Sequence, residues 1–369
     1  MAKILMKGNE ALAEAAIYAG CRFYFGYPIT PQNEIPAYMA KRMPEVNGTF
    51  LQAESEIAAI NMVYGAVACG ARAMTTSSSP GISLKQEGIS YLVGAELPAV
   101  IANVSRGGPG LGNIAPSQAD YFQATKGGGH GDYKMLVYAP STLQETVDLT
   151  ILAFNRADFY RNPVMILSDG ILGQMMEPIE FKSFLPNNSS PSNHLHKEEE
   201  INVYSNNKPW ALTGAKGRKP NVIKSLYLDE GILEARNFII SEKYERMKKD
   251  EVKFEEFGTE DADLIVVAFG SCARIVKASI AMAREAGNKV GLLRPITLFP
   301  FPKRRLEQLS KKCKSFLVIE MNMGQMIEDV KISVYKQQAD VFFYGRPGGG
   351  IPNPKELLDE IYKYLIGID

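Results

Sequence analysis

Residues 97–104 constrain the fold more than any other segment, because they are apolar almost throughout instead of alternating between apolar and polar side chains. A strand of this kind is typical of a parallel sheet that helices cover on both faces. Strand-like and helix-like segments alternate around it. The sequence therefore predicts an α/β fold for residues 1–183, with a parallel sheet and helices on both faces.

The same alternation returns near the end of the chain and predicts a second α/β unit over residues 261–369. The strands predicted in the two units are residues 23–25, 97–104, 135–138, 164–167, 264–269, 289–293, 315–319 and 340–344. The predicted helices are residues 9–18, 56–69, 85–94, 143–156, 273–286, 303–312, 325–337 and 354–365.

Residues 184–260 are predicted to be a linker, with a loop rich in helix breakers at 186–193 and a long connecting helix at 231–257. We expect this helix to pack across the first unit, with Glu242–Arg246 and Glu245–Lys249 as ion pairs on its outer face. Its apolar stripe consists of Leu233, Ala235, Ile239, Ile240, Tyr244 and Met247.

The composition excludes several classes of function. Lys and Arg number 41, as do Asp and Glu, so the net charge is zero, which argues against nucleic acid or an anionic membrane as a partner. No apolar run is long enough to span a bilayer, and the N-terminal segment lacks the apolar core of a signal peptide. The four cysteines have no spacing typical of a metal site, which predicts buried free thiols, no bound metal and a cytoplasmic location.

A segment with two prolines follows the first predicted strand and is a candidate binding loop. In Tyr27-Pro28-Ile29-Thr30-Pro31 the prolines force the backbone out of regular structure and hold a hydroxyl between them. Thr30 either binds a ligand or merely forms a hydrogen bond within the loop.

Glu56 is a candidate catalytic acid, because it opens a helix that is apolar nearly all round and is therefore expected to be buried. Ser55 is the expected N-cap of this helix, and Glu54 is the alternative acid. A simpler role also fits, since a carboxylate in the first turn is favoured by the helix dipole.

Arg106 follows the buried strand and precedes a run rich in glycine at 107–112, where a ligand can approach the backbone closely. An arginine there can bind a carboxylate with two hydrogen bonds, or it can simply lie on a surface loop. The glycines imitate a dinucleotide-binding fingerprint, but Asn113 stands where its last glycine belongs and the prolines spoil the turn. The hydroxyl-rich segment 75–81, which contains Ser79, suits a polar ligand or an ordinary helix cap.

Taken together, these motifs resemble those of the alpha-type subunit of 2-oxoacid:ferredoxin oxidoreductases, and the resemblance extends over essentially the whole chain. The motifs are residues 27–31, 52–56 with Gly65 nine positions further on, 106–109, 168–170 and 293–300. Within the family, the chain is most similar to the branched-chain members, which act on 3-methyl-2-oxobutanoate.

The resemblance implies a thiamine-diphosphate pyrimidine-binding domain at 1–183 and a domain like the transketolase C-terminal domain at 261–369. It implies that Glu56 faces the aminopyrimidine ring, and that Thr30 and Arg106 lie beside the 2-oxoacid. The cofactor-binding residues that it implies are Tyr27, Pro28, Ile29, Glu56 and Ser79.

The family's diphosphate-and-magnesium motif and the cluster-binding cysteines are missing from the sequence. The resemblance therefore implies partners: a beta-type subunit for the diphosphate and Mg²⁺, a gamma subunit, and a ferredoxin-like subunit with iron–sulfur clusters. A dimer of such heteromers, active only when assembled, would convert the 2-oxoacid and coenzyme A to acyl-CoA and carbon dioxide while reducing ferredoxin.

Four other functions stay open at this stage. They are a member specific for 2-oxoglutarate, a beta subunit of a lipoamide-linked 2-oxoacid dehydrogenase, a Rossmann dehydrogenase, and a non-catalytic assembly subunit.

Overall fold

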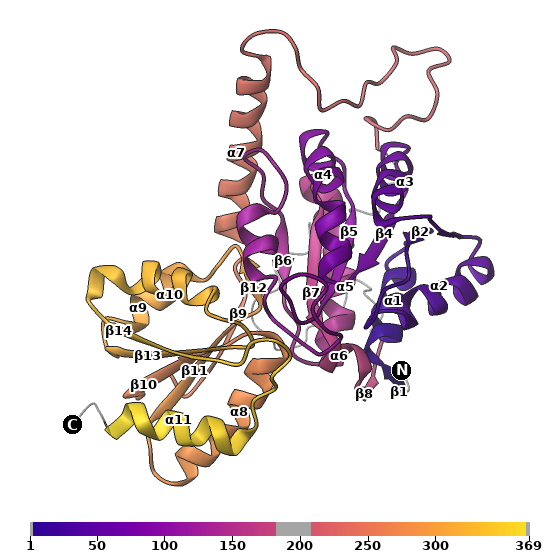
Figure 1. Cartoon of the computed structure of the whole chain (residues 1–369). Coiled ribbons are helices and arrows are strands. Elements are labelled where there is room, and N and C mark those ends of the chain that lie inside the picture. The colour runs from indigo at the N-terminus through magenta and orange to yellow at the C-terminus, as the bar shows by residue number, and fades with distance from the viewer. Residues whose placement is uncertain (1–2, 182–207, 367–369) are drawn as a thin grey trace.

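Parallel strands form the core of the first unit in the computed structural model, which describes residues 3–181 and 208–366 (Figure 1). Within these residues the larger sheet has seven strands in the order β12-β6-β7-β5-β4-β2-β3, all parallel to their neighbours except β12. The strands are β2 (Phe23–Gly26), β3 (Thr49–Gln52), β4 (Ala73–Ser77), β5 (Val100–Ser105), β6 (Leu136–Tyr138), β7 (Val164–Asp169) and β12 (Thr297–Phe299). The expected parallel sheet is confirmed, and β12 joins it from the second half of the chain. The loop predicted at 186–193 lies outside the described residues.

Helices cover both faces of this sheet, because α3 packs against α4 whereas α1 packs against α5 (Figure 1). Side-chain caps start three of them: the Ser55 hydroxyl accepts a hydrogen bond from the backbone of α3, and Thr142 and Asp169 do the same for α5 and α6. The helices are α1 (Gly8–Tyr18), α2 (Glu34–Glu45), α3 (Glu56–Ala68), α4 (Ser79–Gly94), α5 (Leu143–Tyr160) and α6 (Gly170–Gln174). A short antiparallel pair, β1 (Ile4–Lys7) and β8 (Met176–Ile179), completes the unit.

The second unit is built on a sheet with the order β14-β13-β10-β11-β9, in which only β9 is antiparallel. Its strands are β9 (Phe254–Phe257), β10 (Leu264–Val267), β11 (Val290–Pro295), β13 (Ser315–Glu320) and β14 (Asp340–Gly345). Its helices are α8 (Gly270–Glu285), α9 (Lys303–Leu309), α10 (Met326–Val334) and α11 (Pro354–Ile366). The four strands and four helices predicted here are found. Where the chain is best divided into domains stays a prediction.

The predicted connecting helix is shorter than expected. Helix α7 runs over Ile232–Asp250, and the prediction that it reaches residue 257 is wrong because 254–257 form strand β9. In that strand Glu255 pairs with Arg294 of β11, so pairing at the sheet edge prevails over helix propensity. Glu251, where the helix ends, is buried and accepts a hydrogen bond from Tyr160 of α5.

The apolar stripe of α7 is only half right. Ile240, Tyr244 and Met247 are buried against the first unit, but Leu233 and Ile239 are about half exposed. The reason is visible in Figure 1, where the first turns of α7 project past the neighbouring helices.

The charged residues of α7 also depart from the prediction. Glu245 pairs with Lys248 instead of Lys249, and the Arg246 guanidinium lies over the rings of Phe159 and Tyr160.

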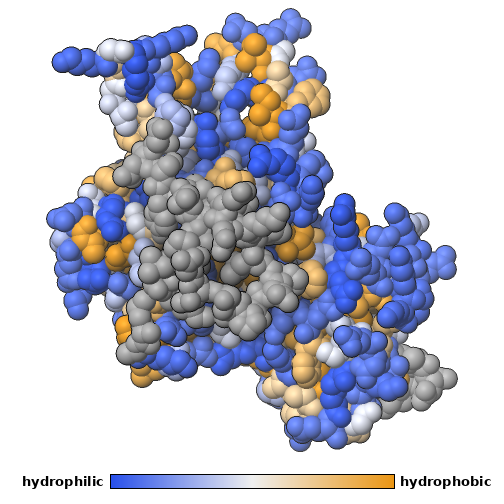
Figure 2. Space-filling view, turned by 180° about the vertical axis from the view of Figure 1, so that it is seen from behind, coloured by the Kyte–Doolittle hydropathy of each residue, from blue (hydrophilic) through white to orange (hydrophobic). Residues whose placement is uncertain are grey.

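The surface is mainly hydrophilic on the face shown in Figure 2, with apolar side chains in separate patches. Within the described residues no helix combines the length and apolarity needed to cross a membrane. The four cysteines are free, and Cys69 is exposed, contrary to the expectation that all four are buried.

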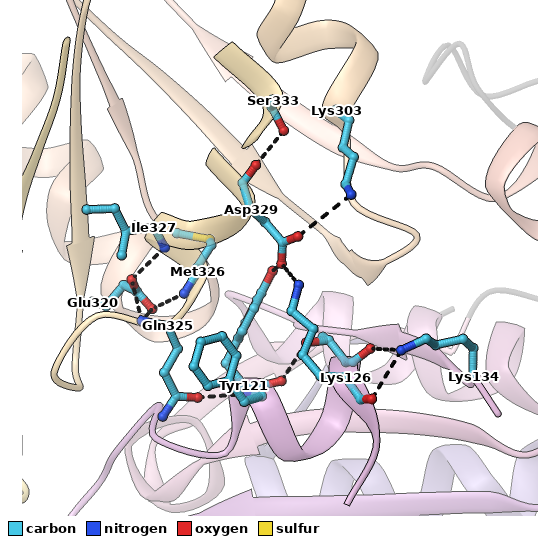
Figure 3. Close-up of polar contacts among 12 residues, drawn as sticks. Tyr121, Lys126, Lys134, Lys303, Glu320, Gln325, Met326, Ile327, Asp329 and Ser333 are labelled. Atoms are coloured by element: carbon cyan, nitrogen blue, oxygen red, sulfur yellow. Dashed lines mark hydrogen bonds and ion pairs between the residues drawn. The ribbon is translucent and has the colours of Figure 1, made fainter. Parts of the chain in front are cut away.

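The two units meet along the segment that follows the glycine-rich loop (Figure 3). The side chain of Gln325 bridges this segment, since it donates to the Ala119 carbonyl (2.7 Å) and accepts from the Phe122 amide (2.7 Å). Glu320 shapes the turn that carries Gln325, because its buried carboxylate accepts from the amides of Met326 and Ile327. Burial raises the pKa of Glu320 above its usual value, although these hydrogen bonds oppose the shift.

Asp329 of α10 anchors the same junction. Its buried carboxylate accepts a hydrogen bond from the Tyr121 hydroxyl (2.7 Å) and pairs with Lys126 (2.6 Å), as Figure 3 shows. Both partners belong to the first unit, so a single carboxylate of the second unit holds two side chains of the first.

We expect Tyr121→Phe to lower the free energy of unfolding by about 1–3 kcal/mol, because a buried carboxylate loses a hydrogen-bond donor. Urea unfolding of the full chain measures the change. Tyr335→Phe is the matched control, since Tyr335 is 80% exposed and its loss should change stability by about 0.5 kcal/mol or less. Equal stability of the two variants would contradict this account of the junction.

Candidate functional site

The carboxyl ends of the parallel strands meet at one edge of the larger sheet, and the residues singled out by the sequence lie there. Tyr27 follows β2, Arg106 follows β5, and Ser79 opens α4 just after β4. This edge is where open parallel sheets commonly bind ligands. The local structure therefore brings together loops that are far apart in the sequence.

Glu56 lies in the first turn of α3, after the edge strand β3. The N-cap hydroxyl of Ser55 accepts a hydrogen bond from the Ala58 amide (3.1 Å), which fixes the start of the helix. The side chain of Glu56 is 6% exposed, whereas Glu54 is exposed. Glu56 is thus the sheltered acid of the two, as the sequence predicted.

The helix behind Glu56 is less buried than predicted. Ile57 of α3 is 48% exposed and Asn61 is also exposed, so the expectation of a helix buried all round is wrong for this chain. The buried face consists of Ala59, Ile60, Val63, Val67 and Ala68.

Helix α4 approaches Glu56 so closely that a side chain at the contact would displace its neighbours. A Cβ atom at Gly81 would lie 2.5 Å from Glu56 Oε1 and 2.1 Å from Ser77 Oγ. Two turns further along, a Cβ at Gly88 would lie 2.5 Å from the Ile60 side chain. These two glycines let α3 and α4 pack together and hold the Glu56 carboxylate against the start of α4.

Arg106 connects two loops of the candidate site. Its guanidinium donates to the Thr30 carbonyl (3.0 Å) and to the Leu111 carbonyl (3.0 Å). It is 7% exposed, so it is not the surface arginine of the simpler interpretation. Thr30 and Arg106 are therefore in contact, and that they lie beside a 2-oxoacid stays a prediction.

Ser79 joins Arg106 to the first turn of α4. Its hydroxyl donates to Asp120 (2.6 Å) and accepts from the Arg106 amide (3.0 Å). Asp120 also accepts a hydrogen bond from Asn103 of β5 (2.8 Å). Because Gly81 lies in the same turn, the start of α4 contacts both Glu56 and Arg106.

The loop with two prolines is half open to solvent. Tyr27 is 36% exposed, Pro28 and Thr30 are exposed, and Ile29 is half-buried. The Thr30 hydroxyl accepts a hydrogen bond from Asn33 (3.3 Å), so it has a structural role whatever it binds.

A buried chain of hydrogen bonds that the sequence did not indicate holds this loop on the sheet. Gln32 donates to the Tyr27 carbonyl (3.3 Å) and accepts from Thr76 of β4, which in turn contacts the hydroxyl of Tyr24 (2.6 Å). Burial raises the pKa of Tyr24 well above its usual value, so the phenol stays neutral. No motif marks these residues, because each belongs to an ordinary strand or loop pattern.

Buried polar atoms without a hydrogen-bond partner gather around the same edge. They are the hydroxyls of Thr75, Ser77, Ser78 and Ser105, Nε of Arg106 and Nζ of Lys85. Native proteins pair most buried polar groups, so a group of unpaired ones beside a carboxylate is typical of a site that a polar ligand completes.

Lys85 is the functional candidate that sequence reasoning missed. It is fully buried on α4, which begins six residues before the predicted helix start at Lys85. One signal was present: Ile82, Lys85, Ile89 and Leu92 share one helix face by their spacing, so the lysine lies on the apolar stripe.

A surface concavity lies beyond the opposite end of α4, about 24 Å along the helix from its start. Its walls include Arg161 and Arg236, which are already engaged with Glu96: Arg236 pairs with the carboxylate, and Arg161 donates to the carbonyl (3.2 Å). The convergence of unpaired groups favours the edge near Glu56 as the site.

Among the described residues no group of three His, Cys, Asp or Glu side chains could hold a metal ion. The arrangement does fit the pyrimidine end of thiamine diphosphate, because a sheltered carboxylate and several unpaired hydroxyls converge beside one helix start.

Two family models match the chain. Residues 14–222 match the thiamine-diphosphate-binding model of pyruvate flavodoxin/ferredoxin oxidoreductase, and residues 262–357 match core domain II of pyruvate:ferredoxin oxidoreductase. The first match covers more than half of the chain and includes the whole candidate site.

Full-length relatives are similar in sequence. The ketoisovalerate oxidoreductase subunit VorB of Methanothermobacter marburgensis is 48% identical over 98% of this chain and 97% of its own length. The 2-oxoglutarate synthase subunit KorA of Methanocaldococcus jannaschii is 38% identical over 95% of this chain and 97% of its own.

Solved structures are similar in fold. A 2-oxoglutarate:ferredoxin oxidoreductase chain from Magnetococcus marinus, solved with 2-oxoglutarate, coenzyme A and succinyl-CoA, superposes with a TM-score of 0.81 and 26% identity. The match covers 98% of this chain but 65% of that longer one. A split-gene transketolase has a TM-score of 0.59 at 14% identity, which shows a shared fold and confirms the predicted fold class.

The contact between Gly81 and Glu56 yields a prediction. Gly81→Ala should lower the free energy of unfolding by about 1–3 kcal/mol, because the added methyl group overpacks the contact between α3 and α4. Gly65→Ala is the matched control: nothing lies within 4 Å of its Cβ position, so alanine should stabilise α3 by about 0.5–1 kcal/mol. Denaturant unfolding of both variants measures the difference, and a stabilised Gly81→Ala would contradict the close approach.

Proposed function

Since this chain belongs to the pyruvate flavodoxin/ferredoxin oxidoreductase family, the thiamine-diphosphate-dependent 2-oxoacid:ferredoxin oxidoreductases, we propose that it provides the half of their active site that holds the pyrimidine ring. The observation that carries the proposal is the sheltered Glu56 carboxylate at the start of α3, beside the contact between Arg106 and Thr30. Family membership sets aside the Rossmann dehydrogenase and the lipoamide-linked dehydrogenase.

Glu56 would hold the cofactor by a hydrogen bond to a nitrogen of the pyrimidine ring, with Tyr27, Pro28 and Ile29 beside the ring and Ser79 behind Arg106. When bound, thiamine diphosphate supplies a carbon nucleophile for the keto group and an electron sink for the loss of carbon dioxide. Glu56 contributes a fixed acid–base group that exchanges a proton with the ring nitrogen in a site largely shielded from water.

Arg106 and Thr30 would orient the substrate. Two N–H groups of Arg106 are used by loop carbonyls, but Nε is buried without a partner and can donate to a substrate carboxylate. Thr30 is exposed on the adjacent loop, and its carbonyl accepts a hydrogen bond from Arg106. Holding a 2-oxoacid by its carboxylate fixes the position of its keto carbon.

We propose 3-methyl-2-oxobutanoate as the substrate, converted with coenzyme A to the acyl-CoA and carbon dioxide while ferredoxin is reduced. Support comes from the 48% identity to a ketoisovalerate oxidoreductase subunit, against 38% to a 2-oxoglutarate synthase subunit. The 2-oxoglutarate alternative is the less supported of the two.

The relatives are named as subunits, and we propose that this chain is active only in a complex of the same kind. A beta-type subunit would bring the diphosphate site and Mg²⁺, and a gamma subunit and a ferredoxin-like subunit with iron–sulfur clusters would complete a dimer of heteromers in the cytoplasm. Exposed apolar side chains near Arg106 support a covering partner: Leu111 is 81% exposed and Ile114 is 63% exposed.

Glu56→Gln in the assembled enzyme should lower kcat by roughly 10²-fold or more, the usual loss when an acid–base group is removed. Glu54→Gln is the control, because that side chain is exposed two residues away and should leave kcat unchanged. Reduction of a viologen dye by the purified complex measures the rates. A wild-type rate for Glu56→Gln would favour the non-catalytic assembly subunit instead.

The substrate proposal is tested with a panel of 2-oxoacids and the same dye. We expect kcat/KM for 3-methyl-2-oxobutanoate to exceed that for 2-oxoglutarate by at least about tenfold. The reason is that a pocket shaped for an apolar side chain binds a charged side chain poorly. A preference for 2-oxoglutarate would overturn the substrate but not the role of Glu56.

A further inference from the structure

Lys85 is a buried cation without a hydrogen bond. It lies on α4 one turn after Gly81, its side chain is 0% exposed, and Nζ has no hydrogen-bond partner. An unpaired ammonium in an apolar interior is costly, and a methionine of similar length would fill the same space without that cost. Conflicts of this kind between a residue and its surroundings are expected mainly at functional sites.

The packing of α4 on α3 brings Lys85 close to Glu56. Gly81, one turn before Lys85, touches the Glu56 carboxylate, and Gly88, three residues after it, touches Ile60 one turn further along α3. Lys85 therefore lies between the two contact points of the helix pair. Burial lowers the pKa of Lys85 to about 8, and the charge of Glu56 opposes this shift.

The other charged groups near the start of α4 have partners of their own, apart from Nε of Arg106. Asp120 accepts hydrogen bonds from Ser79 and Asn103, and the Arg106 guanidinium points toward the carbonyls of Thr30 and Leu111. Glu56 is the charge whose field offsets the burial of Lys85.

We propose that Lys85 is a positioning residue for Glu56: across the contact between α3 and α4 its buried amine balances the carboxylate charge and so favours the orientation that faces the ligand. The inference rests on the proposed function and adds to it a residue that acts through Glu56. The proposal places the Lys85 amine against Glu56 and not against the substrate, because Lys85 lies between the contacts that Gly81 and Gly88 make with α3. Its effect on turnover must therefore vanish once Glu56 is replaced.

The test is a double-mutant cycle in the purified complex with Glu56→Gln, Lys85→Met and both together. We expect Lys85→Met alone to lower kcat about tenfold or more, with the loss in kcat exceeding any change in KM, since an acid–base residue is left misplaced. The double variant should be no slower than Glu56→Gln. Lys41→Met, on an exposed position of α2, controls for the loss of a lysine and should keep the wild-type rate.

Thermal unfolding of the same variants without cofactor gives a readout that is independent of turnover. Lys85→Met should have a higher Tm than wild type at pH 7, and the difference should shrink as the pH rises from about 8 toward 10.5. The sign follows because in this range the unfolded chain binds the proton that native Lys85 has already lost, so wild-type stability rises with pH. The gain in Tm should also be larger when residue 56 is glutamine, which leaves Lys85 without its countercharge.

Three outcomes would overturn the proposal: wild-type turnover of Lys85→Met, losses that multiply in the double variant, or an equal gain in Tm with Glu and Gln at position 56. A wild-type rate for Glu56→Gln would instead remove the proposed function. In that case the comparison of Tm between the two backgrounds still decides whether Lys85 and Glu56 interact.

Discussion

The close packing of α3 on α4 is the constraint on which the candidate site depends. A Cβ atom at Gly81 or Gly88 would collide with the side chain of Glu56 or Ile60, so the backbone of α4 lies directly against side chains of α3. This contact directs the carboxylate toward the end of β4 and toward the turn that carries Ser79. The position of the Glu56 carboxylate therefore depends on two glycines of α4 as much as on the N-cap of α3.

The second α/β unit also contributes to the geometry of the site. Asp329 and Gln325 hold the segment around Tyr121. Asp120 in that segment accepts a hydrogen bond from the Ser79 hydroxyl. The Ser79 hydroxyl in turn accepts a hydrogen bond from the Arg106 amide. The backbone of this segment thus links the hydrogen bonds of the junction in Figure 3 to those that hold the arginine of the site, so the junction bears on the site as well as on stability.

Local patterns predicted the parts of this molecule that depend on local physics. The strands at the sheet centre, the start of α3 at Ser55 and the sheltered Glu56 follow from apolar runs and helix caps. The predictions that were wrong concern segments whose structure depends on contacts with residues distant in the sequence. Residues 254–257 form strand β9 because they pair with the edge of the second sheet. Leu233 is exposed because the first turns of α7 extend beyond the first unit. The Tyr24–Thr76–Gln32 chain joins three elements and has no signature in any of them.

The burial of Lys85 illustrates how the charge of one side chain can lower the free-energy cost of burying another. The first turn of α3 offers unpaired amides and a positive dipole end, which stabilise a negative charge at Glu56. That negative charge then opposes the cost of burying the lysine on the facing helix. The carboxylate and the amine support each other, and both depend on the start of α3. Loosening the first turn of α3 would therefore cost both charges their support, whereas removing the amine would leave the cap of α3 intact.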